Sequence, residues 1–581
     1  MESISFIKIL KTFFFNLEKK RQRQILFLFL LVILAAFAET ISLASAFPFL
    51  QIIIDQSYIW ENDFLNSFLL FLGINRSDNI IFPICVLFGS TAFFAGVIKS
   101  YNLWYGIKIS SLISSDLSYL CFKQNLYQNY ENSIEKNSSD LITNNTVFIN
   151  EANAIFSSSA RLLSNIIIGL CISIYLIFLN TKLALSSIFI FIIAYFLIGK
   201  FLQKKLLKNS ILIEENSKRQ TQIIQESIGS FRDILLNSNQ KYFLNIYKNI
   251  DYDLKAKNAE NIFYNLFPRY AIEGLFLLIL SILVFFISLR STDFVNIIAI
   301  LGSFAIGGQK LLPCMQQSYG TWSYIIGSKY LLINILKLSN QKQDISLINY
   351  EPKIFDFKDK IKLNNICFKY SGTENYILKN FNLEISKGEK IGIIGQTGVG
   401  KSTVVDIIIG LLEPTNGSLV VDEKNIYDYR YPQRRLDWRR NIAHVPQKIF
   451  LNDATIAENI AFGESLKEIN LRKVQEAAKK AEIHQYISKQ PLNYFGRIGE
   501  NGIKLSGGQM QRIGLARAFY KSSEIIVLDE ATSALDTFTE SKIIDTVFKS
   551  SKNITIILVT HRENSIKACD KVVSISHSSF D

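Results

Sequence analysis

The residues Gly395–Thr403 read G-Q-T-G-V-G-K-S-T and match the pattern of a phosphate-binding loop, G-x-x-x-x-G-K-[ST]. The apolar run Lys390–Ile394 before them predicts a buried strand, and Val404–Leu412 after them predicts a packed helix. Glycines let backbone N–H groups turn toward a polyanion, and the N-terminus of the helix adds partial positive charge. Because the motif requires this strand, loop and helix, the context favours a nucleoside triphosphate site over a chance glycine turn.

Two side chains of this loop have specific tasks. Lys401 is expected to reach the β- and γ-phosphates, and Ser402 to offer its hydroxyl to Mg²⁺. The positions expected to surround the phosphates are Gly395, Gln396, Thr397, Gly398, Val399, Gly400, Lys401, Ser402 and Thr403. Upstream, Tyr370 is a candidate to stack on a nucleotide base, although a tyrosine alone would also suit the core.

Acidic residues at the end of a second buried strand supply further chemistry. The strand predicted over Ser523–Leu528 is followed by Asp529 and Glu530. An acid at the carboxyl end of such a strand suits Mg²⁺ coordination, which we assign to Asp529. Glu530 can polarise the attacking water as a general base. The strand predicted over Thr555–Val559 brings His561 to the γ-phosphate, where it would hold that water or the glutamate.

The segment Leu505–Gln509, which reads L-S-G-G-Q, begins a predicted helix over Gln509–Tyr520. Ser506 and the glycine amides would form a second anion-binding helix terminus. One chain does not need two cradles for the phosphates of one nucleotide. Two copies facing head to tail do, because Ser506–Gly508 of one copy would close the loop of the other.

The first half of the chain is characterised by apolar runs that are long enough to span a membrane. A length of 581 residues predicts two or more domains, and the 49% of hydrophobic residues gather in runs long enough to cross a ~30 Å hydrocarbon layer. These runs number about six. They cover Ile25–Ile54, Ile80–Ile107, Leu162–Leu179, Leu183–Leu202, Phe267–Leu289 and Phe294–Leu312. A set of soluble core helices would not explain so many runs of membrane length.

The segments between the runs predict the orientation of the chain. Basic residues at Lys19–Arg23 place the N-terminus in the cytoplasm, and an even number of spans places the C-terminus there too. The long polar segments Lys108–Arg161 and Gln203–Asn265 predict helices that continue into the cytoplasm. The short apolar segment within Tyr58–Asn75 predicts an interfacial helix on the outer face.

The charge and the cysteines exclude other classes of function. The net charge of +13 comes from dispersed basic residues, many beside apolar runs, so we expect membrane-proximal loops and no nucleic-acid partner. The six cysteines show no C-x-x-C spacing and predict neither a metal site nor a disulfide framework. The polar run Lys337–Lys353 marks a domain boundary, which divides the chain into residues 1–345 and 346–581.

Ionisable residues within the spans are costly and invite a functional interpretation. They include Glu39, Lys99, Arg269 and Lys310. The three cations could together line a cavity that accepts an anion, or they could extend from the span ends toward water. Glu39 has less room to do so, and we expect it to face a cavity or a cationic partner.

Taken together, residues 355–575 resemble the ATP-binding-cassette (ABC) domain. In that comparison Gly395–Ser402 is Walker A, Ile525–Asp529 is Walker B and Leu505–Gln509 is the signature. The resemblance implies that ATP and Mg²⁺ are bound, with Asp529 as a Mg²⁺ ligand, Glu530 as the catalytic glutamate and His561 as the switch histidine. It also implies that Gln447 is the Q-loop residue, Tyr370 the A-loop aromatic residue and Ser533–Asp536 the D-loop. The signature residues at the nucleotide would be Ser506, Gly507, Gly508 and Gln509. No motif is degenerate, so both sites of a homodimer are expected to hydrolyse ATP.

The spans ahead of the cassette resemble the exporter arrangement of this superfamily. The expected fold is a membrane all-α domain of about six transmembrane helices with long cytoplasmic extensions, followed by an α/β P-loop cassette. One chain is half a transporter, so the resemblance implies a homodimer in the cell membrane with the cassette and both termini in the cytoplasm. Gln447 would then sense both Mg²⁺ and a docked helix of the membrane domain.

The substrate must be inferred from the first half. The run Phe37–Phe49 resembles the first span of bacterial lipid-linked oligosaccharide flippases, which use cavity arginines to receive a pyrophosphate. Arg269 matches one such position, Lys310 matches another with lysine in place of arginine, and a third arginine is replaced near Gln317. The leading hypothesis is ATP-driven flipping of a lipid-linked saccharide or related anionic lipid. The alternatives are a multidrug or lipid exporter, and an ATP-gated regulator or channel.

Overall fold

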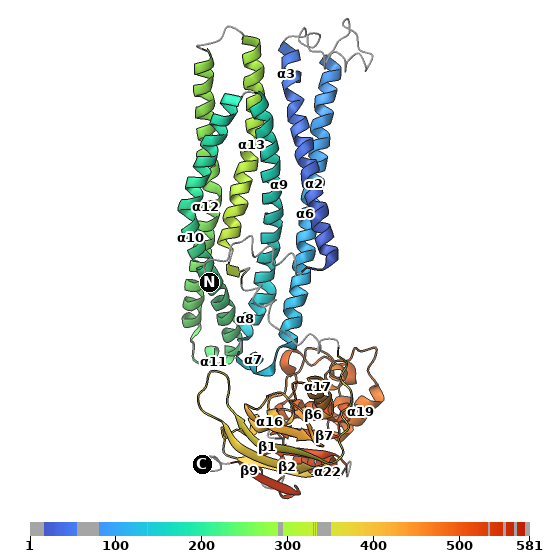
Figure 1. Cartoon of the computed structure of the whole chain (residues 1–581). Helices are drawn as coiled ribbons and strands as arrows, with labels where there is room; N and C mark the ends of the chain where they lie inside the picture. Colours follow the sequence, from blue (N-terminus) through green and yellow to red (C-terminus); the bar gives the residue numbers. More distant parts are fainter. Residues whose placement is uncertain are drawn as a thin grey trace. The chain divides into compact units, whose positions relative to one another are not determined.

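The computed structural model of this protein consists of a helical part and a part that mixes helices and strands (Figure 1). The described residues are 17–54, 81–135, 137–179, 181–288, 294–328, 330–331, 333, 350–532, 535–549, 553–562 and 566–575. By its contacts the chain divides into two compact units, Met1–Tyr127 with Lys136–Lys342, and Gln128–Glu135 with Gln343–Asp581. The domain boundary expected at about residue 345 falls within residues 334–349, outside the described ranges.

The first unit is built from long helices (Figure 1). They are α2 (Lys19–Ala44), α3 (Ala46–Ile54), α6 (Ile81–Tyr127), α9 (Ile149–Leu179), α10 (Thr181–Gly229), α12 (Gln240–Ser288) and α13 (Phe294–Gly327), with the short α8 (Ser138–Thr143), η1 (Asn144–Phe148) and α11 (Phe231–Leu236). Within this unit α2 packs along α6, α9 along α13, and α10 along α12. The described residues of the predicted apolar runs are helical, and the run Ile25–Ile54 is divided between α2 and α3.

Three described helical stretches are long and apolar enough to cross a membrane: Lys19–Leu50, Ile81–Tyr127 and Ser138–Leu179. The expected number of about six spans stays a prediction, and the expected outer helix within 58–75 lies outside the described residues. The helices α10 and α12 have 49 residues each. At ~1.5 Å per residue each is about 70 Å long, more than twice a ~30 Å hydrocarbon layer. This length fits the prediction that helices continue beyond the membrane.

Large apolar side chains point outward along these helices. Examples on three helices are Phe82 (73% exposed), Phe178 (84%) and Phe201 (71%). Such a surface would be unfavourable in water, whereas lipid tails solvate it, and every backbone group inside a helix has its hydrogen bond within the helix. The first unit is therefore suited to a bilayer.

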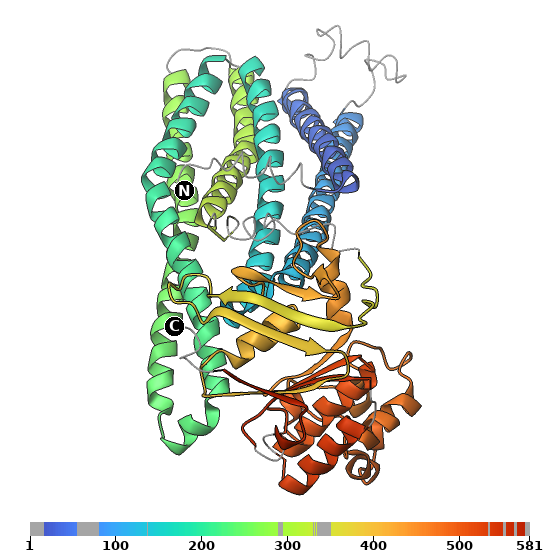
Figure 2. The ribbon, with the colours of Figure 1, turned by 60° about the horizontal axis from the view of Figure 1, so that its bottom comes forward.

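The second unit contains two sheets. A four-stranded antiparallel sheet has the order β2-β1-β4-β5, and a five-stranded parallel sheet has the order β6-β7-β8-β3-β9. The first sheet contains β1 (Lys360–Phe368), β2 (Leu378–Ser386), β4 (Asn416–Val421) and β5 (Lys424–Asn425), and the second contains β3 (Lys390–Gly395), β6 (Ile442–Val445), β7 (Ile525–Asp529), β8 (Thr555–Val559) and β9 (Lys571–Ile575). The first two strands of the antiparallel sheet are drawn in yellow in Figure 2.

Helices complete the second unit. They are α7 (Tyr130–Glu135), α16 (Lys401–Ile408), α17 (Gln433–Arg440), α18 (Ile456–Ile460), α19 (Leu471–Lys480), α20 (His484–Ser488), η2 (Asn493–Phe495), η3 (Glu500–Gly502), α21 (Gly507–Lys521) and α22 (Thr537–Lys549). Strand β8 is buried along its whole length, as expected for a parallel strand covered on both faces. The fully buried Trp438 fills the core beside α16, where its Nε1 donates to the Ile408 carbonyl at 2.7 Å.

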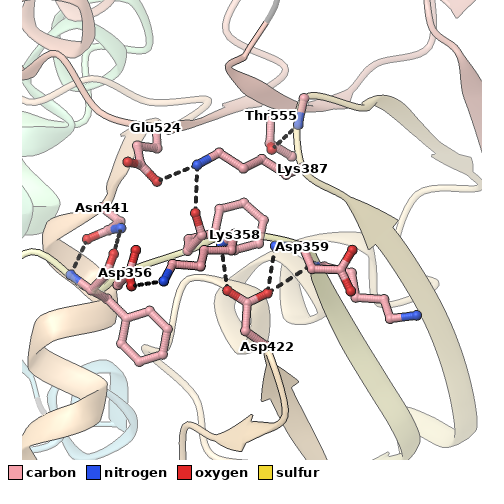
Figure 3. A network of polar contacts seen from close by, with 12 residues as sticks. Asp356, Lys358, Asp359, Lys387, Asp422, Asn441, Glu524 and Thr555 are labelled. Atoms are coloured by element: carbon pink, nitrogen blue, oxygen red, sulfur yellow. Dashed lines mark hydrogen bonds and ion pairs between the residues drawn. The ribbon is translucent and has the colours of Figure 1, made fainter.

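A polar network holds the segment that leads into β1 (Figure 3). The Asp422 carboxylate accepts hydrogen bonds from the backbone N–H groups of Lys358, Asp359 and Lys360 at 2.5 to 2.9 Å. Asp422 begins the two-residue turn between β4 and β5 and has a left-handed φ of 44°. Lys387 Nζ donates to the Phe357 carbonyl at 2.6 Å. These bonds fix the entry of the chain into the cassette sheet.

Candidate functional site

The predicted phosphate loop is formed as expected. Residues 396–400 connect β3 to α16, and residues 396–398 are exposed, whereas Val399 packs into the core. Gly398 and Gly400 have left-handed φ values of 85° and 99°. A Cβ on Gly400 would lie 3.0 Å from Ile377 Cγ2. The loop therefore needs glycine at position 400 for both its backbone conformation and the space around it.

Lys401 lies inside the loop, with 7% of its surface exposed. Its Nζ donates to the carbonyls of Gly395 (2.8 Å) and Gln396 (2.9 Å) and is 3.3 Å from His561 Nε2. The ammonium group is thus held at the start of α16. Phosphate oxygens that enter the loop could take over these hydrogen bonds.

The predicted catalytic residues converge at the carboxyl ends of neighbouring parallel strands. Gln447 follows β6, Glu530 follows β7 and His561 follows β8, and these three strands are adjacent in the sheet. Glu530 Oε2 accepts a hydrogen bond from Gln447 Nε2 at 2.6 Å, and Glu530 Oε1 is 3.3 Å from His561 Nε2. The carboxylate is therefore held from two sides at the edge of the sheet where the phosphate loop also begins.

The backbone of Glu530 has a left-handed φ of 47°, and its N–H donates to the Val559 carbonyl at 2.9 Å. A non-glycine residue adopts this conformation at a cost of about 1–2 kcal/mol, which the surrounding strands must offset. The turn directs the chain away from β7 directly after Asp529. Two consecutive acids can therefore serve different tasks.

Asp529 lies next to Ser402 and is suited to a metal ion. Burial and the charge of Glu530 raise the pKa of Asp529, while a hydrogen bond with Ser402 and the charge of Lys401 oppose this rise. Burial and the charge of Asp529 raise the pKa of Asp406 to about 6. A divalent cation beside Ser402 and Asp529 would relieve this concentration of negative charge.

The donor set fits Mg²⁺ bound together with phosphate. Among the residues that the structure describes, no group of three or more His, Cys, Asp and Glu side chains could hold a metal ion by itself. Mg²⁺ needs no such group, because it is commonly bound by one or two protein ligands, waters and substrate phosphates. Ser402 and Asp529, with Gln447 nearby, supply ligands of this kind.

The signature segment forms a helix terminus of its own. Ser506 caps α21: its N–H donates to Gln509 Oε1 at 2.9 Å, and Gln509 N–H donates to Ser506 Oγ at 3.3 Å. The side chain and the N–H of Gln509 therefore form the capping hydrogen bonds. The N–H groups of Gly507 and Gly508 lie in the first turn of this 15-residue helix. Within the described part of the chain, no hydrogen bond joins residues 506–509 to residues 395–403. In the D-loop, residues 533–534 lie outside that part.

Tyr370 is half-buried and packs edge-on against Phe368, with the ring centroids 5.0 Å apart. The next residue, Ser371, donates from its N–H (3.0 Å) and its hydroxyl (2.7 Å) to Glu131 Oε1. Glu131 lies on α7, which the contacts group with the second unit. No sequence motif marks this short helix between two long ones, so α7 was not predicted.

The four ionisable residues predicted at the substrate site divide into two places. Glu39 Oε1 lies 3.4 Å from Lys310 Nζ and 3.8 Å from Lys99 Nζ, which confirms that Glu39 faces cationic partners. Lys310 Nζ also donates to Ser42 Oγ at 3.2 Å. Arg269 instead lines a polar cavity of about 580 Å³. Within the described residues of one chain, Arg269 therefore does not join the cluster of Glu39, Lys99 and Lys310.

Comparisons with known proteins agree with this architecture. Residues 28–308 match the family model of the ABC transporter transmembrane region, and residues 378–533 match that of the ABC transporter. The heterocyst differentiation ATP-binding protein HepA of a Nostoc species is 30% identical over 441 residues, which cover 75% of this chain and 70% of HepA. A bacterial Atm1-family ABC exporter with ATP bound has the same fold, with a TM-score of 0.78 at 19% identity, over 96% of this chain and 93% of that one.

Other relatives match over shorter stretches. An ATP-dependent lipid A-core flippase of Chromohalobacter salexigens is 34% identical over 236 residues, 41% of this chain and 39% of the flippase. YgaD of Bacillus subtilis, a protein named for multidrug export, is 39% identical over 220 residues, 38% of this chain and 37% of YgaD. These two matches thus span about two fifths of the relatives' length. With both family models matched in order and HepA aligned over most of its length, this protein belongs to the ABC transporter family, in which an exporter-type transmembrane region precedes an ATP-hydrolysing cassette.

Proposed function

We propose that this protein is an ATP-driven exporter that moves a lipid-linked saccharide or a related anionic lipid from the inner to the outer leaflet of a membrane. One observation carries the proposal of hydrolysis: Glu530 lies between Gln447 and His561 at the edge of the sheet, beside the loop that holds Lys401. This arrangement has a base for water and a cation for phosphate within one cluster.

The geometry supports a division of tasks during hydrolysis. The loop amides and Lys401 Nζ would bind the β- and γ-phosphates, and a carboxylate oxygen of Glu530 would accept the proton of the attacking water. His561 Nε2 would orient Glu530 and approach the γ-phosphate. Ser402, Asp529 and Gln447 would hold Mg²⁺, which neutralises charge on the phosphate oxygens when it is bound.

We infer that two copies of the chain complete each ATP site. The glycine amides at the start of α21 offer an anion site, yet within the described residues they make no hydrogen bond to the phosphate loop of their own chain. A second copy in head-to-tail orientation would place Ser506 and these amides against the γ-phosphate. A homodimer would then contain two equivalent sites.

The substrate class is supported by the cationic side chains of the first unit. Lys99 and Lys310 share one carboxylate, Glu39, so this cluster retains one positive charge. Arg269 adds another beside the polar cavity. A multidrug exporter is the second candidate, because an apolar cavity of about 1000 Å³ also lies among α9, α10 and α13.

Reconstitution in proteoliposomes tests these candidates. The full-length protein should flip a fluorescent lipid-linked sugar when Mg²⁺ and ATP are supplied, and the Glu530→Gln variant should not. ATP turnover that lipophilic cations stimulate, without any lipid flipping, would favour the multidrug exporter. Ion conductance that survives Glu530→Gln would favour a channel and contradict the exporter.

A further inference from the structure

We propose that Arg562 and Glu540 are positioning residues for ATP hydrolysis, which set His561 against Glu530. Arg562 directly follows His561 in the chain, and Glu540 lies on α22. The pair binds the segment Leu535–Asp536, which belongs to the D-loop of the family comparison and is called the D-loop end here. The place of His561 beside the catalytic carboxylate then depends on the conformation of the D-loop end. This role rests on the proposed task of His561 in hydrolysis.

The guanidinium group of Arg562 binds two acceptors on the segment that follows Walker B. Its Nη1 and Nη2 donate to the Leu535 carbonyl at 3.1 and 3.2 Å, and Nη1 also donates to Glu540 Oε2. A guanidinium group can hold a carbonyl and a carboxylate at the same time, because its N–H groups form a rigid planar fork. Arg562 therefore fixes the backbone at Leu535 together with the first turn of α22, which contains Glu540.

Glu540 is buried, with 5% of its surface exposed. Its Oε1 accepts a hydrogen bond from Thr532 Oγ1 at 2.9 Å, while its Oε2 binds Arg562. Thr532 is buried as well, and its carbonyl accepts a hydrogen bond from the Leu535 N–H at 3.0 Å. A buried carboxylate is costly unless its oxygens have partners, and here both oxygens have one. Glu540 thus binds Thr532 directly and Leu535 through Arg562.

The short segment after β8 connects this cluster to the carboxylate of Glu530. His561 Nε2 lies 3.3 Å from Glu530 Oε1. The next residue, Arg562, donates from its N–H to Oγ1 of the buried Thr560 at 3.1 Å, and the backbone bends at His561 between them. Because His561 and Arg562 are adjacent, a backbone shift that follows the loss of the Arg562 hydrogen bonds would move the imidazole away from Glu530.

The pair acts by geometry rather than by contact with ATP. An arginine near a nucleotide site could in principle bind a phosphate oxygen directly. In this protein Nη1 and Nη2 of Arg562 already donate to Leu535 and Glu540, and the carboxylate of Glu540 offsets the positive charge. The contribution of Arg562 to hydrolysis is therefore expected to pass through His561, its neighbour in the chain.

Steady-state ATP hydrolysis by the full-length protein in detergent tests this role. Arg562→Gln and Glu540→Gln should each lower kcat about 10- to 100-fold and change the KM for ATP by less than about twofold. Arg562→Lys, which keeps the charge but not the planar fork, should lower kcat by a smaller factor. Arg472→Lys and Glu476→Gln are the matched controls, because both residues are exposed on α19, and they should leave kcat unchanged.

A second measurement separates positioning from a general loss of structure. His561→Ala removes the side chain through which the pair acts, so the further addition of Arg562→Gln or Glu540→Gln should lower kcat by less than about twofold. A fall of the same size with and without His561 would show that the pair does not act through the imidazole, and would overturn the positioning role. ATP binding checks that each variant is folded, and Arg562→Lys takes the same test if Arg562→Gln does not fold.

The outcomes distinguish this role from the proposed function. If His561→Ala lowers kcat while Arg562→Gln and Glu540→Gln do not, the task of His561 stands and the positioning role is wrong. If the pair variants raise the KM for ATP at unchanged kcat, they act on nucleotide binding, which also contradicts the positioning role. If His561→Ala itself hydrolyses ATP at the original rate, the proposed task of His561 fails, and the positioning role fails with it.

Discussion

The ion pairs among Glu39, Lys99 and Lys310 are expected to stabilise the fold of the first unit. Glu39 is 8% exposed, and its carboxylate lies 3.4 Å from Lys310 Nζ and 3.8 Å from Lys99 Nζ. With an effective dielectric constant of ~20, these distances correspond to attractions of about 5 and about 4 kcal/mol before any desolvation cost. The side chain of Lys99 is 49% exposed, so solvent reduces its share, and the pair with Lys310 dominates.

Replacement of Glu39 by glutamine would leave two lysine ammonium groups close together without their carboxylate. Removal of one partner from a buried ion pair costs ~3–5 kcal/mol, and partial exposure places the expected loss near the lower limit, about 3 kcal/mol. The first unit comprises residues 1–127 and 136–342, and at ~2.1 cal/mol/K per residue a unit of this size shifts by about 1.4 °C per kcal/mol, so the unfolding temperature should fall by about 4 °C. The added Lys310→Met substitution should recover much of that loss.

Thermal unfolding of the purified protein in one detergent, followed by intrinsic fluorescence, measures this effect. Glu273→Gln is the matched control, because Glu273 is exposed and forms no ion pair among the described residues. It should change stability by less than ~0.5 kcal/mol. The reasoning is refuted if Glu39→Gln unfolds at the same temperature as Glu273→Gln, or if the double variant is less stable than Glu39→Gln alone.

Other predictions concern the cassette. Glu530→Gln should lower ATP hydrolysis by about 10²–10⁴-fold while ATP still binds. Phosphate release measures the hydrolysis, and a nucleotide-binding assay measures the affinity. Hydrolysis near the original rate would exclude Glu530 as the base. Lys401→Ala should abolish hydrolysis and export without loss of membrane insertion, and appreciable hydrolysis would mean that the loop does not bind the phosphates. Glu131→Ala should raise the KM for ATP about three- to tenfold with kcat retained, since Ser371 beside Tyr370 loses two hydrogen bonds; a fall in kcat at unchanged KM would contradict this positioning role. The pKa of Asp406 is raised from 3.8 to about 6 in the folded protein, so its ionisation destabilises the fold as pH rises through that window. Relative to the original protein, the Asp406→Asn variant should therefore be more stable at pH 7 than at pH 4. Equal unfolding temperatures for the variant and the original protein at both pH values would show that the carboxyl is not buried.

Local spacing predicts the phosphate loop and the catalytic strands well, for physical reasons. A glycine loop between an apolar strand and a helix has few other uses, and residues that follow buried parallel strands meet at one edge of a sheet. Glu530 and His561 therefore converge as expected, and Gln447, which only the resemblance to the cassette family predicted, lies beside them. The sequence also predicts that the first unit is helical, because apolar runs of membrane length have almost no alternative.

Long-range partners are less accessible to prediction. Glu39, Lys99 and Lys310 were each expected to be functional, but the helix packing that brings both lysines to one carboxylate has no sequence signal. Arg161, which lines the same cavity as Arg269, was not predicted, because it ends a polar segment interpreted as a cytoplasmic extension. Its spacing of four residues from Asn165, on a helix that continues into an apolar run, is the signal that could have identified it.

The helix α7 has a consequence for the order in which this protein is made. Ser371 follows its hydrogen-bond partner Glu131 by 240 residues, so a growing chain presents α7 long before the ribosome has made the rest of its unit. Until the strands of the cassette are synthesised, Glu131 lacks its hydrogen-bond partner Ser371, and a helix of six residues is too short to be stable alone. A chain that stops before the cassette would leave α7 unfolded, and a cassette expressed from Gln343 onward would lack Glu131 altogether. The second unit is therefore completed late and from two distant pieces of the chain, and attempts to produce it separately should supply α7 as an added peptide.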